Sequence, residues 1–320
     1  MVELAQQKRT MDWQRSQRGR SGNRSLRSSV RSRFAFTLVE LAVVMTIVAI
    51  LISLSTVGIQ AARAVARRMQ CQNNLRQQGQ AIIAFEATYR FVPGNGGPID
   101  GNVVRPAHEG IQPGMLQYPN ERWRAWGIGD PSYPVDKQPG PWSYSILPYV
   151  EQSALFEEPV YDAVLSFYRC PDRPRDPPAT PGEDFYGKYI GGNHRYAKFD
   201  YAGNSNVFKN LPDRMKLADI NDGLSQTVFV AEKAHNPLVQ VAESWYFDEP
   251  PWIGGSHGTA RDGIDIFRDA TDIGVGDFWG SAHAVGIHAV FGDGHVELVS
   301  YDVDKDVWPA MLTTSGRDHH

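Results

Sequence analysis

The stretch from Phe34 to Leu54 reads FAFTLVELAVVMTIVAILISL, an apolar run with a single acid, Glu40, near its start. From Leu41 to Ile59 the chain carries no charged residue over 19 positions. A helix of about 20 apolar residues spans the roughly 30 Å hydrocarbon core of a bilayer. The sequence therefore predicts one transmembrane helix over residues 36–59.

The segment before this run is strongly basic. Residues 1–35 hold nine Lys and Arg side chains against Glu3 and Asp12 and are otherwise polar, which predicts an unfolded leader. A nucleic-acid-binding tail is the competing interpretation, but the position directly before an apolar segment favours a membrane-orienting role and no nucleic-acid partner. The positive-inside rule then predicts a cytoplasmic N-terminus and a periplasmic or extracellular C-terminal domain.

A cleaved secretory signal is the alternative to a retained anchor. Such a signal has a short apolar region followed by a small-residue cleavage site. Here the apolar run is longer and continues without a break into AARAVARRMQ. We therefore expect a single-pass protein of the inner (cytoplasmic) membrane that keeps its apolar segment in contact with lipid.

A glutamate inside lipid costs roughly 2.5 to 3.5 kcal/mol at the bilayer centre and less near the interface, so Glu40 needs a partner or a function. The segment Arg33-Phe-Ala-Phe-Thr-Leu-Val-Glu40 resembles the recognition sequence of type IV prepilins and pseudopilins. The resemblance implies that a prepilin peptidase cuts between Ala35 and Phe36, that the new amino group of Phe36 is methylated, and that Glu40 supports assembly with a neighbouring subunit. The alternative is an ordinary anchor whose Glu40 lies at the membrane interface.

Two features depart from the usual prepilin pattern. Ala35 stands where glycine is most common, which implies slower cleavage, and the leader is long enough that Met11 is an alternative start.

Beyond the apolar run, spaced apolar residues predict an amphipathic extension of the same helix over residues 60–90, and Val92-Pro-Gly-Asn-Gly-Gly-Pro98 ends it. Residues 91–320 contain strand-like stretches separated by Asp-Gly turns. We expect an α+β, pilin-like fold, in which a long N-terminal helix packs on an antiparallel β-sheet domain with long loops. The expected apolar helix positions are Val65, Met69, Leu75, Ile82 and Phe85, and the expected strands are Thr227–Ala231, Leu238–Phe247, Gly286–Phe291 and His295–Ser300.

Further segments are similar to a bacterial family of pilin-like proteins of unknown function, which combines the prepilin motif with a C-terminal H-x9-D-G motif. That family has no established enzymatic activity, so the resemblance implies the class of protein without fixing its task, and we expect a protein that is not an enzyme. The matching segments are residues 60–63, 66–77, 141–143, 147–152, 168–171, 200–204 and 220–227, followed by His283 with Asp293 and Gly294.

The two cysteines, Cys71 and Cys170, both follow the membrane segment. In an oxidising periplasm they would form one disulfide closing about 100 residues, worth about 4 to 5 kcal/mol in the loop-entropy model. Two unpaired buried thiols are the alternative.

The segment from Ser281 to His295 is the most enzyme-like, because it combines His283, His288, His295 and Asp293. Imidazole and carboxylate groups suit zinc and other first-row metals. However, Asp293 and Gly294 also fit the positive-φ positions of a tight hairpin turn, and strand alternation places His288 on a solvent face. We therefore expect structural roles for His283, Asp293 and Gly294 and no cofactor. Calcium at Asp293 remains an alternative, although no calcium-loop spacing is present.

The favoured hypothesis is a membrane-anchored prepilin-like structural protein. Such a protein could serve as a subunit of a pilus or of a type II secretion-like assembly. Its expected partners are a prepilin peptidase, membrane lipid and other pilin-like subunits. The rival is a membrane-tethered extracytoplasmic module that binds an envelope polysaccharide or another ligand. A third hypothesis, a metal-dependent enzyme using His283 or Asp293, lacks any nucleophile-elbow or phosphate-loop motif.

Overall fold

The computed structural model describes residues 37–98, 115–117, 123–174, 176–184, 187–190, 194–244, 250–274 and 276–316. The chain divides into two compact units, residues 1–57 and residues 58–320. The predicted leader, with Ala35 and Phe36, lies outside the described residues.

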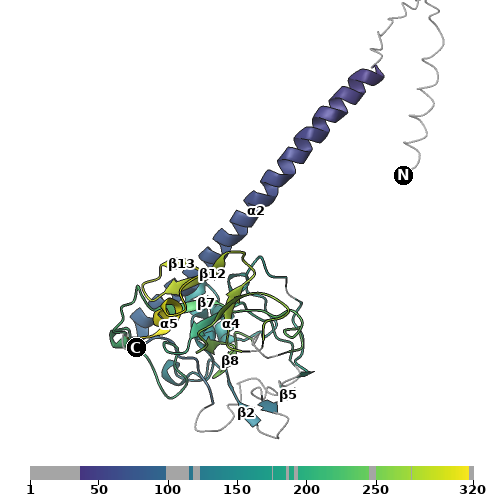
Figure 1. Ribbon diagram of the computed structural model, residues 1–320. Coiled ribbons are helices and arrows are strands. Elements are labelled where there is room, and N and C mark those ends of the chain that lie inside the picture. The colour runs from purple at the N-terminus through teal and green to yellow at the C-terminus, as the bar shows by residue number, and fades with distance from the viewer. Residues whose placement is uncertain are drawn as a thin grey trace, which may run out of the picture. The chain divides into compact units, whose positions relative to one another are not determined.

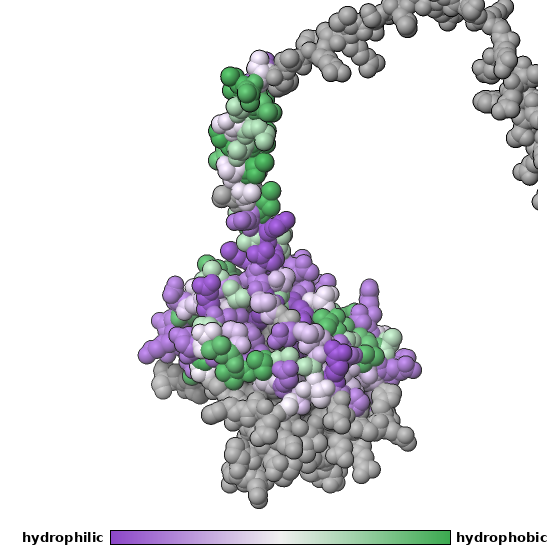
Figure 2. Space-filling model, turned by 90° about the vertical axis from the view of Figure 1, so that its right-hand side faces the viewer, coloured by the Kyte–Doolittle hydropathy of each residue, from purple (hydrophilic) through white to green (hydrophobic). Residues whose placement is uncertain are grey.

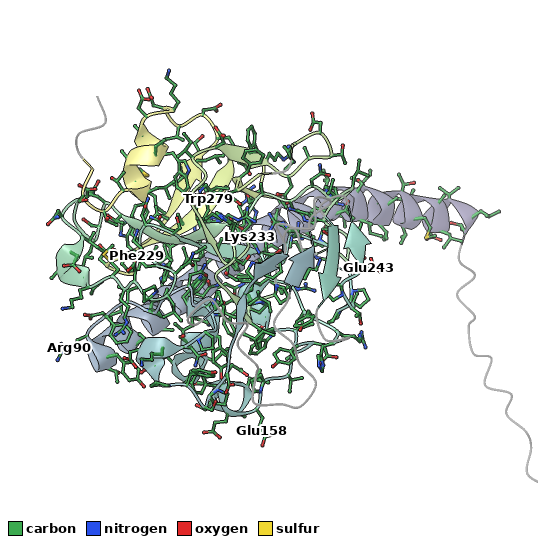
Figure 3. All side chains as sticks on the ribbon, turned by 90° about the horizontal axis from the view of Figure 1, so that it is seen from below. Arg90, Glu158, Phe229, Lys233, Glu243 and Trp279 are labelled. Atoms are coloured by element: carbon green, nitrogen blue, oxygen red, sulfur yellow. The ribbon has the colours of Figure 1, made fainter. Side chains whose placement is uncertain are left out.

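The long helix α2 runs without a break over Leu38–Tyr89 (Figure 1). It covers the predicted membrane segment and the predicted extension. The helix ends where Arg90 adopts a left-handed backbone conformation with φ 66°, and the Arg90 N–H donates to the carbonyl of Glu86 at 2.7 Å (Figure 3).

Residues 58–320 contain short helices and small sheets around α2. The helices and turns of 3₁₀ helix are α3 (Trp142–Ser145), α4 (Ser153–Glu157), α5 (Val307–Leu312), η1 (Val135–Lys137), η2 (Leu147–Val150), η3 (Ser166–Tyr168) and η4 (Leu217–Asp219). The strands are β1 (Met115–Gln117), β2 (Trp123–Ala125), β3 (Gly127–Ile128), β4 (Glu183–Asp184), β5 (Gly187–Ile190), β6 (Tyr201–Asn204), β7 (Val228–Glu232), β8 (Ile253–Gly254), β9 (Ala260–Arg261), β10 (Ile266–Arg268), β11 (Trp279–Ser281), β12 (Gly286–Phe291) and β13 (Val296–Ser300).

The central sheet has the strand order β13-β12-β7-β6-β9. Its β13-β12-β7-β6 pairs are antiparallel, and β9 joins β6 in parallel. A second sheet has the order β2-β1-β5-β4 and is antiparallel, whereas β10 and β11 form a parallel pair. The α+β class and the long helix are thus confirmed, with parallel pairs as an addition to the expected antiparallel arrangement.

Both faces of the central sheet are covered. On one face, Val290 of β12 and Val230 of β7 share a core with Leu75 and Ile82 of α2. On the other face, every second residue of β12 shares a core with Trp308 and Leu312 of α5; these β12 residues are Ile287, Ala289 and Phe291. Because the strand alternation divides β12 between two cores, every one of its residues is buried.

This arrangement corrects three expectations. His288 is buried and not solvent-facing, because α2 covers the face of the sheet that strand alternation left open. Of the expected strand Leu238–Phe247, residues 238–244 form turns and no strand, since the Asn236 side chain accepts the Leu238 N–H and starts a turn, and residues 245–247 lie outside the described residues. Leu75, Ile82 and Phe85 are buried as expected, but Val65 and Met69 are exposed.

Candidate functional site

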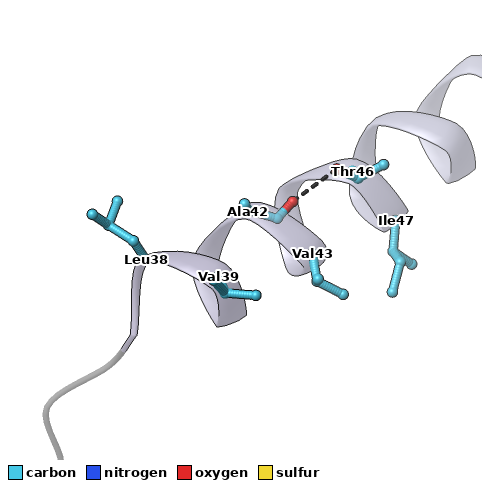
Figure 4. Close-up of a pocket in the computed structure, with 6 residues that line it drawn as sticks. All are labelled: Leu38, Val39, Ala42, Val43, Thr46 and Ile47. Atoms are coloured by element: carbon cyan, nitrogen blue, oxygen red, sulfur yellow. Dashed lines mark hydrogen bonds between the residues drawn. The ribbon is translucent and has the colours of Figure 1, made fainter.

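The N-terminal part of α2 presents an apolar surface. Its large apolar side chains from Leu38 to Leu54 are between 43% and 85% exposed, and Figure 2 shows hydrophobic side chains gathered along this part of the helix. Figure 4 shows Leu38, Val39, Val43 and Ile47 projecting from the helix, while the Thr46 hydroxyl donates to the carbonyl of Ala42 at 2.8 Å. Among the described residues, α2 is the one helix long and apolar enough to cross a membrane, by length and composition.

Glu40 forms a capping box with Thr37 at the start of this helix. Its Oε2 accepts the Thr37 N–H at 2.9 Å and the Thr37 hydroxyl at 2.7 Å, and the Thr37 Oγ1 accepts the Glu40 N–H at 3.2 Å. The Thr-x-x-Glu pattern of this capping box is visible in the sequence, although Glu40 was expected either to pair with a neighbouring subunit or to lie at the membrane interface. The carboxylate is therefore held at the helix N-terminus, where the helix dipole favours negative charge.

A second group of functional side chains lies buried in the unit of residues 58–320. Cys71 on α2 and Cys170 just after η3 are both free thiols, with their Sγ atoms 3.2 Å apart. The structure thus brings the two cysteines together, as the disulfide expectation requires, at a separation longer than an S–S bond of about 2.05 Å. Contact with Cys71 and burial both raise the pKa of the Cys170 thiol.

Glu232 and His283 complete this buried group, which we call the Cys-His-Glu cluster (Cys71, Cys170, Glu232 and His283). Nε2 of His283 lies 3.8 Å from Sγ of Cys170 and 3.2 Å from Oε1 of Glu232. All four residues are buried, and one ligand-type atom of each lies within 4.8 Å of the others. They come from α2, the loop after η3, the end of β7 and the loop between β11 and β12.

The charges in the cluster are paired. Burial acts to raise the pKa of Glu232, but His283 and His288 outweigh it and lower that pKa to about 2. Burial acts to lower the pKa of His283, but its contacts with Cys170 and Glu232 raise that pKa to about 10. The other oxygen of Glu232, Oε2, accepts the His288 N–H at 2.8 Å.

A buried arginine next to the cluster fixes the loop that carries Cys170. Arg173 donates two bonds to the carboxylate of Asp269, at 2.7 and 2.9 Å, and one to Asp200 at 3.1 Å. Asp200 in turn accepts the Cys170 N–H at 2.6 Å. Such bidentate pairs fix geometry as well as charge.

Amides of α2 hold the same loop from the other side. Asn74 donates to the carbonyl of Arg169 at 2.9 Å, and Gln78 donates to the carbonyl of Phe167 at 2.7 Å. Together with Cys71 these residues follow the i, i+3, i+7 spacing of one helix face. The sequence predicted an amphipathic helix and a family resemblance here, but no role for Asn74 and Gln78 in holding the loop of Cys170.

Asp293 and Gly294 lie apart from the Cys-His-Glu cluster, in the β12–β13 turn. The Gly294 N–H donates to the Phe291 carbonyl at 2.9 Å, and Gly294 has φ 87°. Both Asp293 and Gly294 were expected to have a positive φ, but only Gly294 has one. A single positive φ at this place is typical of a type I turn followed by a bulge. Asp293 pairs with exposed His295 at 2.6 Å.

Comparison with known families gives two matches. Residues 60–306 match the family described as "Protein of unknown function (DUF1559)", and residues 30–56 match the prokaryotic N-terminal methylation motif. The chain belongs to the DUF1559 family. No curated protein and no solved structure matches it.

The methylation motif makes this DUF1559 protein prepilin-like. It implies processing by a prepilin peptidase and association with a membrane, and with the apolar part of α2 it indicates a membrane-anchored, single-pass protein. The resemblance stated from the sequence is thereby confirmed. Glu232, Asp172 and Arg173 were not among the predicted site residues. Asp172 and Arg173 follow Cys170 by two and three positions, so a charged pair beside this cysteine was visible in the sequence, whereas Glu232 is 62 positions further on and no spacing links it to the cysteines.

Proposed function

We propose that this DUF1559 protein is a structural subunit and not an enzyme, and that it assembles through the N-terminal part of α2 into a pilus or a type II secretion-like pseudopilus. In this proposal cleavage after Ala35 frees the amino group of Phe36, which is then methylated. The leader is cytoplasmic and the C-terminal domain lies in the periplasm or outside the cell.

The observation that carries the proposal is the position of Glu40 on an exposed apolar helix. The capping box with Thr37 holds the carboxylate in place at the start of the apolar segment, where a charge is costly in lipid. The methylated amino group of Phe36 on a neighbouring subunit supplies the opposite charge. Helix association then places the two charges together away from lipid.

The apolar surface around Glu40 supports assembly in the same way. Leu38, Val39, Val43 and Ile47 line one hollow on the helix surface (Figure 4). A neighbouring helix that fills such a hollow gains van der Waals contact, which is a main source of association between helices in lipid.

The test compares Glu40→Ala and Glu40→Gln with Ser55→Ala in native membranes. Ser55 lies in the same segment but outside the hollow of Figure 4, and its hydroxyl donates to the Leu51 carbonyl of its own helix at 2.7 Å. Chemical crosslinking reports multimers, and intact mass confirms processing of each variant. We expect both Glu40 variants to lose multimers at least tenfold and Ser55→Ala to keep them.

Multimers that persist in Glu40→Ala would overturn the assembly role of this residue. A wild-type chain that is processed yet monomeric, and that binds envelope polysaccharide, would favour the tethered binding module instead. Turnover of a substrate by the purified chain would overturn the non-enzymatic assignment.

A further inference from the structure

We propose that the Cys-His-Glu cluster is a structural site for one divalent metal ion of the zinc class, with Cys71, Cys170, Glu232 and His283 as its four ligands. The ion would join helix α2 to the central sheet within residues 58–320.

The separations between the ligand atoms fit a tetrahedral site. With Zn–S near 2.3 Å and Zn–N or Zn–O near 2.0 to 2.1 Å, a tetrahedron has S···S edges of about 3.8 Å, S···N edges of about 3.5 Å and N···O edges of about 3.3 Å. The corresponding distances are 3.2 Å between the sulfurs, 3.8 Å from Cys170 Sγ to His283 Nε2, and 3.2 Å from Nε2 to Glu232 Oε1. These three distances lie within about 0.6 Å of the tetrahedral edges, and the other three pairs of ligand atoms lie within 4.8 Å of one another.

One ligand atom has only an ion-pair contact. Oε1 of Glu232, in a side chain that is 0% exposed, lies 3.2 Å from Nε2 of His283 but forms no hydrogen bond of regular geometry with the described residues, whereas Oε2 accepts the His288 N–H. A buried carboxylate oxygen normally accepts at least one hydrogen bond, so this atom keeps the capacity for a further ligand. Oε1 points to the side where the two sulfurs and Nε2 of His283 meet.

Outer groups hold the ligands as they do in known metal sites. Nδ1 of His283 lies 3.0 Å from Oδ2 of Asp172, on the ring edge opposite the cluster. Metal-bound histidines are commonly supported by a carboxylate at that position. Asp172 itself pairs with Arg67 of α2, and Asp200 fixes the Cys170 backbone.

The donor set selects the class of metal. Thiolates favour zinc and other soft or borderline ions over calcium and magnesium, which prefer oxygen. All four ligands are buried, which indicates a closed structural site and not a catalytic one with an open position. On binding, the two thiols and the His283 imidazolium each release a proton, so the ion and its ligands together carry a charge of −1.

The same two sulfurs would otherwise form the disulfide expected from the sequence. That reaction removes two hydrogens and needs an external oxidant, and it leaves Glu232 and His283 as an ion pair without sulfur ligands. Metal binding and the disulfide are mutually exclusive, so one measurement on the wild-type chain separates them.

The experiment uses the full-length chain, recovered in detergent from its native membrane without chelator. Metal content, thiol titration after unfolding and intact mass are measured together. The protein is then stripped, loaded with Co²⁺ and examined for thiolate-to-cobalt charge-transfer absorption. We expect one zinc-class ion per chain, two titratable thiols and intense charge-transfer bands.

Variants assign the ligands. Glu232→Gln and His283→Gln should weaken Zn²⁺ binding at least tenfold, measured by competition with a chromophoric chelator. The matched control is His295→Gln, whose ring is exposed and pairs with Asp293 outside the cluster, and it should bind as the wild type does. Glu232→Asp keeps the carboxylate and serves where Glu232→Gln fails to fold.

Several outcomes would overturn the proposal. A Cys71–Cys170 disulfide in the native chain, or a reduced chain that takes up no Co²⁺, would do so. Co²⁺ uptake that persists in the double variant Cys71→Ser/Cys170→Ser, or Zn²⁺ affinity unchanged in both Glu232→Gln and His283→Gln, would place the metal elsewhere, for instance at the half-exposed group His257, Asp262 and Asp277.

Discussion

Gly79 of α2 lies directly against Val290 of β12. A Cβ added at Gly79 would come within 2.6 Å of Cγ2 of Val290, closer than real side chains approach one another. This contact brings the helix backbone onto the sheet and sets the spacing at which Cys71, eight residues earlier on the same helix, meets Cys170.

Gly79→Ala should therefore destabilise the protein. Alanine favours a helix over glycine by about 1 kcal/mol, but overpacking at this contact costs about 1 to 3 kcal/mol. The control is Gly58→Ala, since nothing lies within 4 Å of a Cβ there, and it should be neutral or stabilising by up to about 1 kcal/mol. Urea unfolding in detergent measures both, and a stabilised Gly79→Ala chain would contradict the close contact.

The metal-free protein should be most stable between about pH 4.5 and pH 6.5. The lowered pKa of Glu232, from 4.5 to about 2, stabilises the fold above pH 4.5, and that contribution of about 3 kcal/mol disappears as pH falls towards 2. The raised pKa of His283 stabilises the fold below pH 6.5, and this contribution disappears as pH rises through about 10. Urea midpoints with chelator present, followed by tryptophan fluorescence, measure the profile.

Glu232→Gln tests whether Glu232 causes the fall in stability below pH 4.5. The variant should lose about 3 kcal/mol at pH 6, since His283 is left without its buried partner, and should show a flatter decline below pH 4.5. Exposed Glu157→Gln is the control and should keep the wild-type profile. If stability falls below pH 4.5 in Glu232→Gln as it does in the wild type, other carboxylates cause that fall.

Arg173→Lys should cost about 2 kcal/mol or more. Lysine keeps the charge, but it cannot bridge both oxygens of Asp269 and reach Asp200 as the guanidinium does. Arg76→Lys on an exposed face of α2 is the control and should change stability by less than about 0.5 kcal/mol. Equal losses of stability in Arg173→Lys and Arg76→Lys would contradict a specific role for the Arg173 guanidinium.

The β12–β13 turn should depend on Gly294 and not on a calcium ion at Asp293. Gly294→Ala should cost about 1 to 2 kcal/mol, because alanine resists φ 87° and its Cβ would lie 3.1 Å from Ile83 Cδ1. Asp293→Ala loses one exposed pair and should cost less than about 1 kcal/mol. Thermal unfolding with and without Ca²⁺ checks this, and a Ca²⁺-dependent rise lost in Asp293→Ala would assign a calcium site.

Processing should leave Phe36 as the N-terminal residue, heavier by one methyl group. Ala35→Gly should speed conversion of precursor to mature chain, since glycine is the residue that prepilin peptidases most often meet at this position. Pulse labelling and N-terminal sequencing measure the rate and the site. A chain that keeps residues 1–35 in its native membrane would contradict the predicted cleavage.

The membrane anchor and its processing site could be predicted from residues 1–59 alone. An apolar run of membrane length, a basic flank and the spacing from Ala35 to Glu40 are local features, so they identify a prepilin-like anchor without knowledge of the fold. The hairpin of β12 and β13 could also be predicted, because alternating apolar residues and an Asp-Gly turn are signals contained within a few neighbouring residues.

The surroundings of Cys71 could not be predicted from the sequence, because they depend on how distant segments pack. Glu232 and His283 are 161 and 212 positions further along the chain, and no period or spacing connects residues across such loops. His288 was misplaced for the same reason, because strand alternation distinguishes two faces but does not tell whether a helix covers the second one. Burial between α2 and the sheet, a property of packing, turned isolated cysteines, acids and histidines into one cluster.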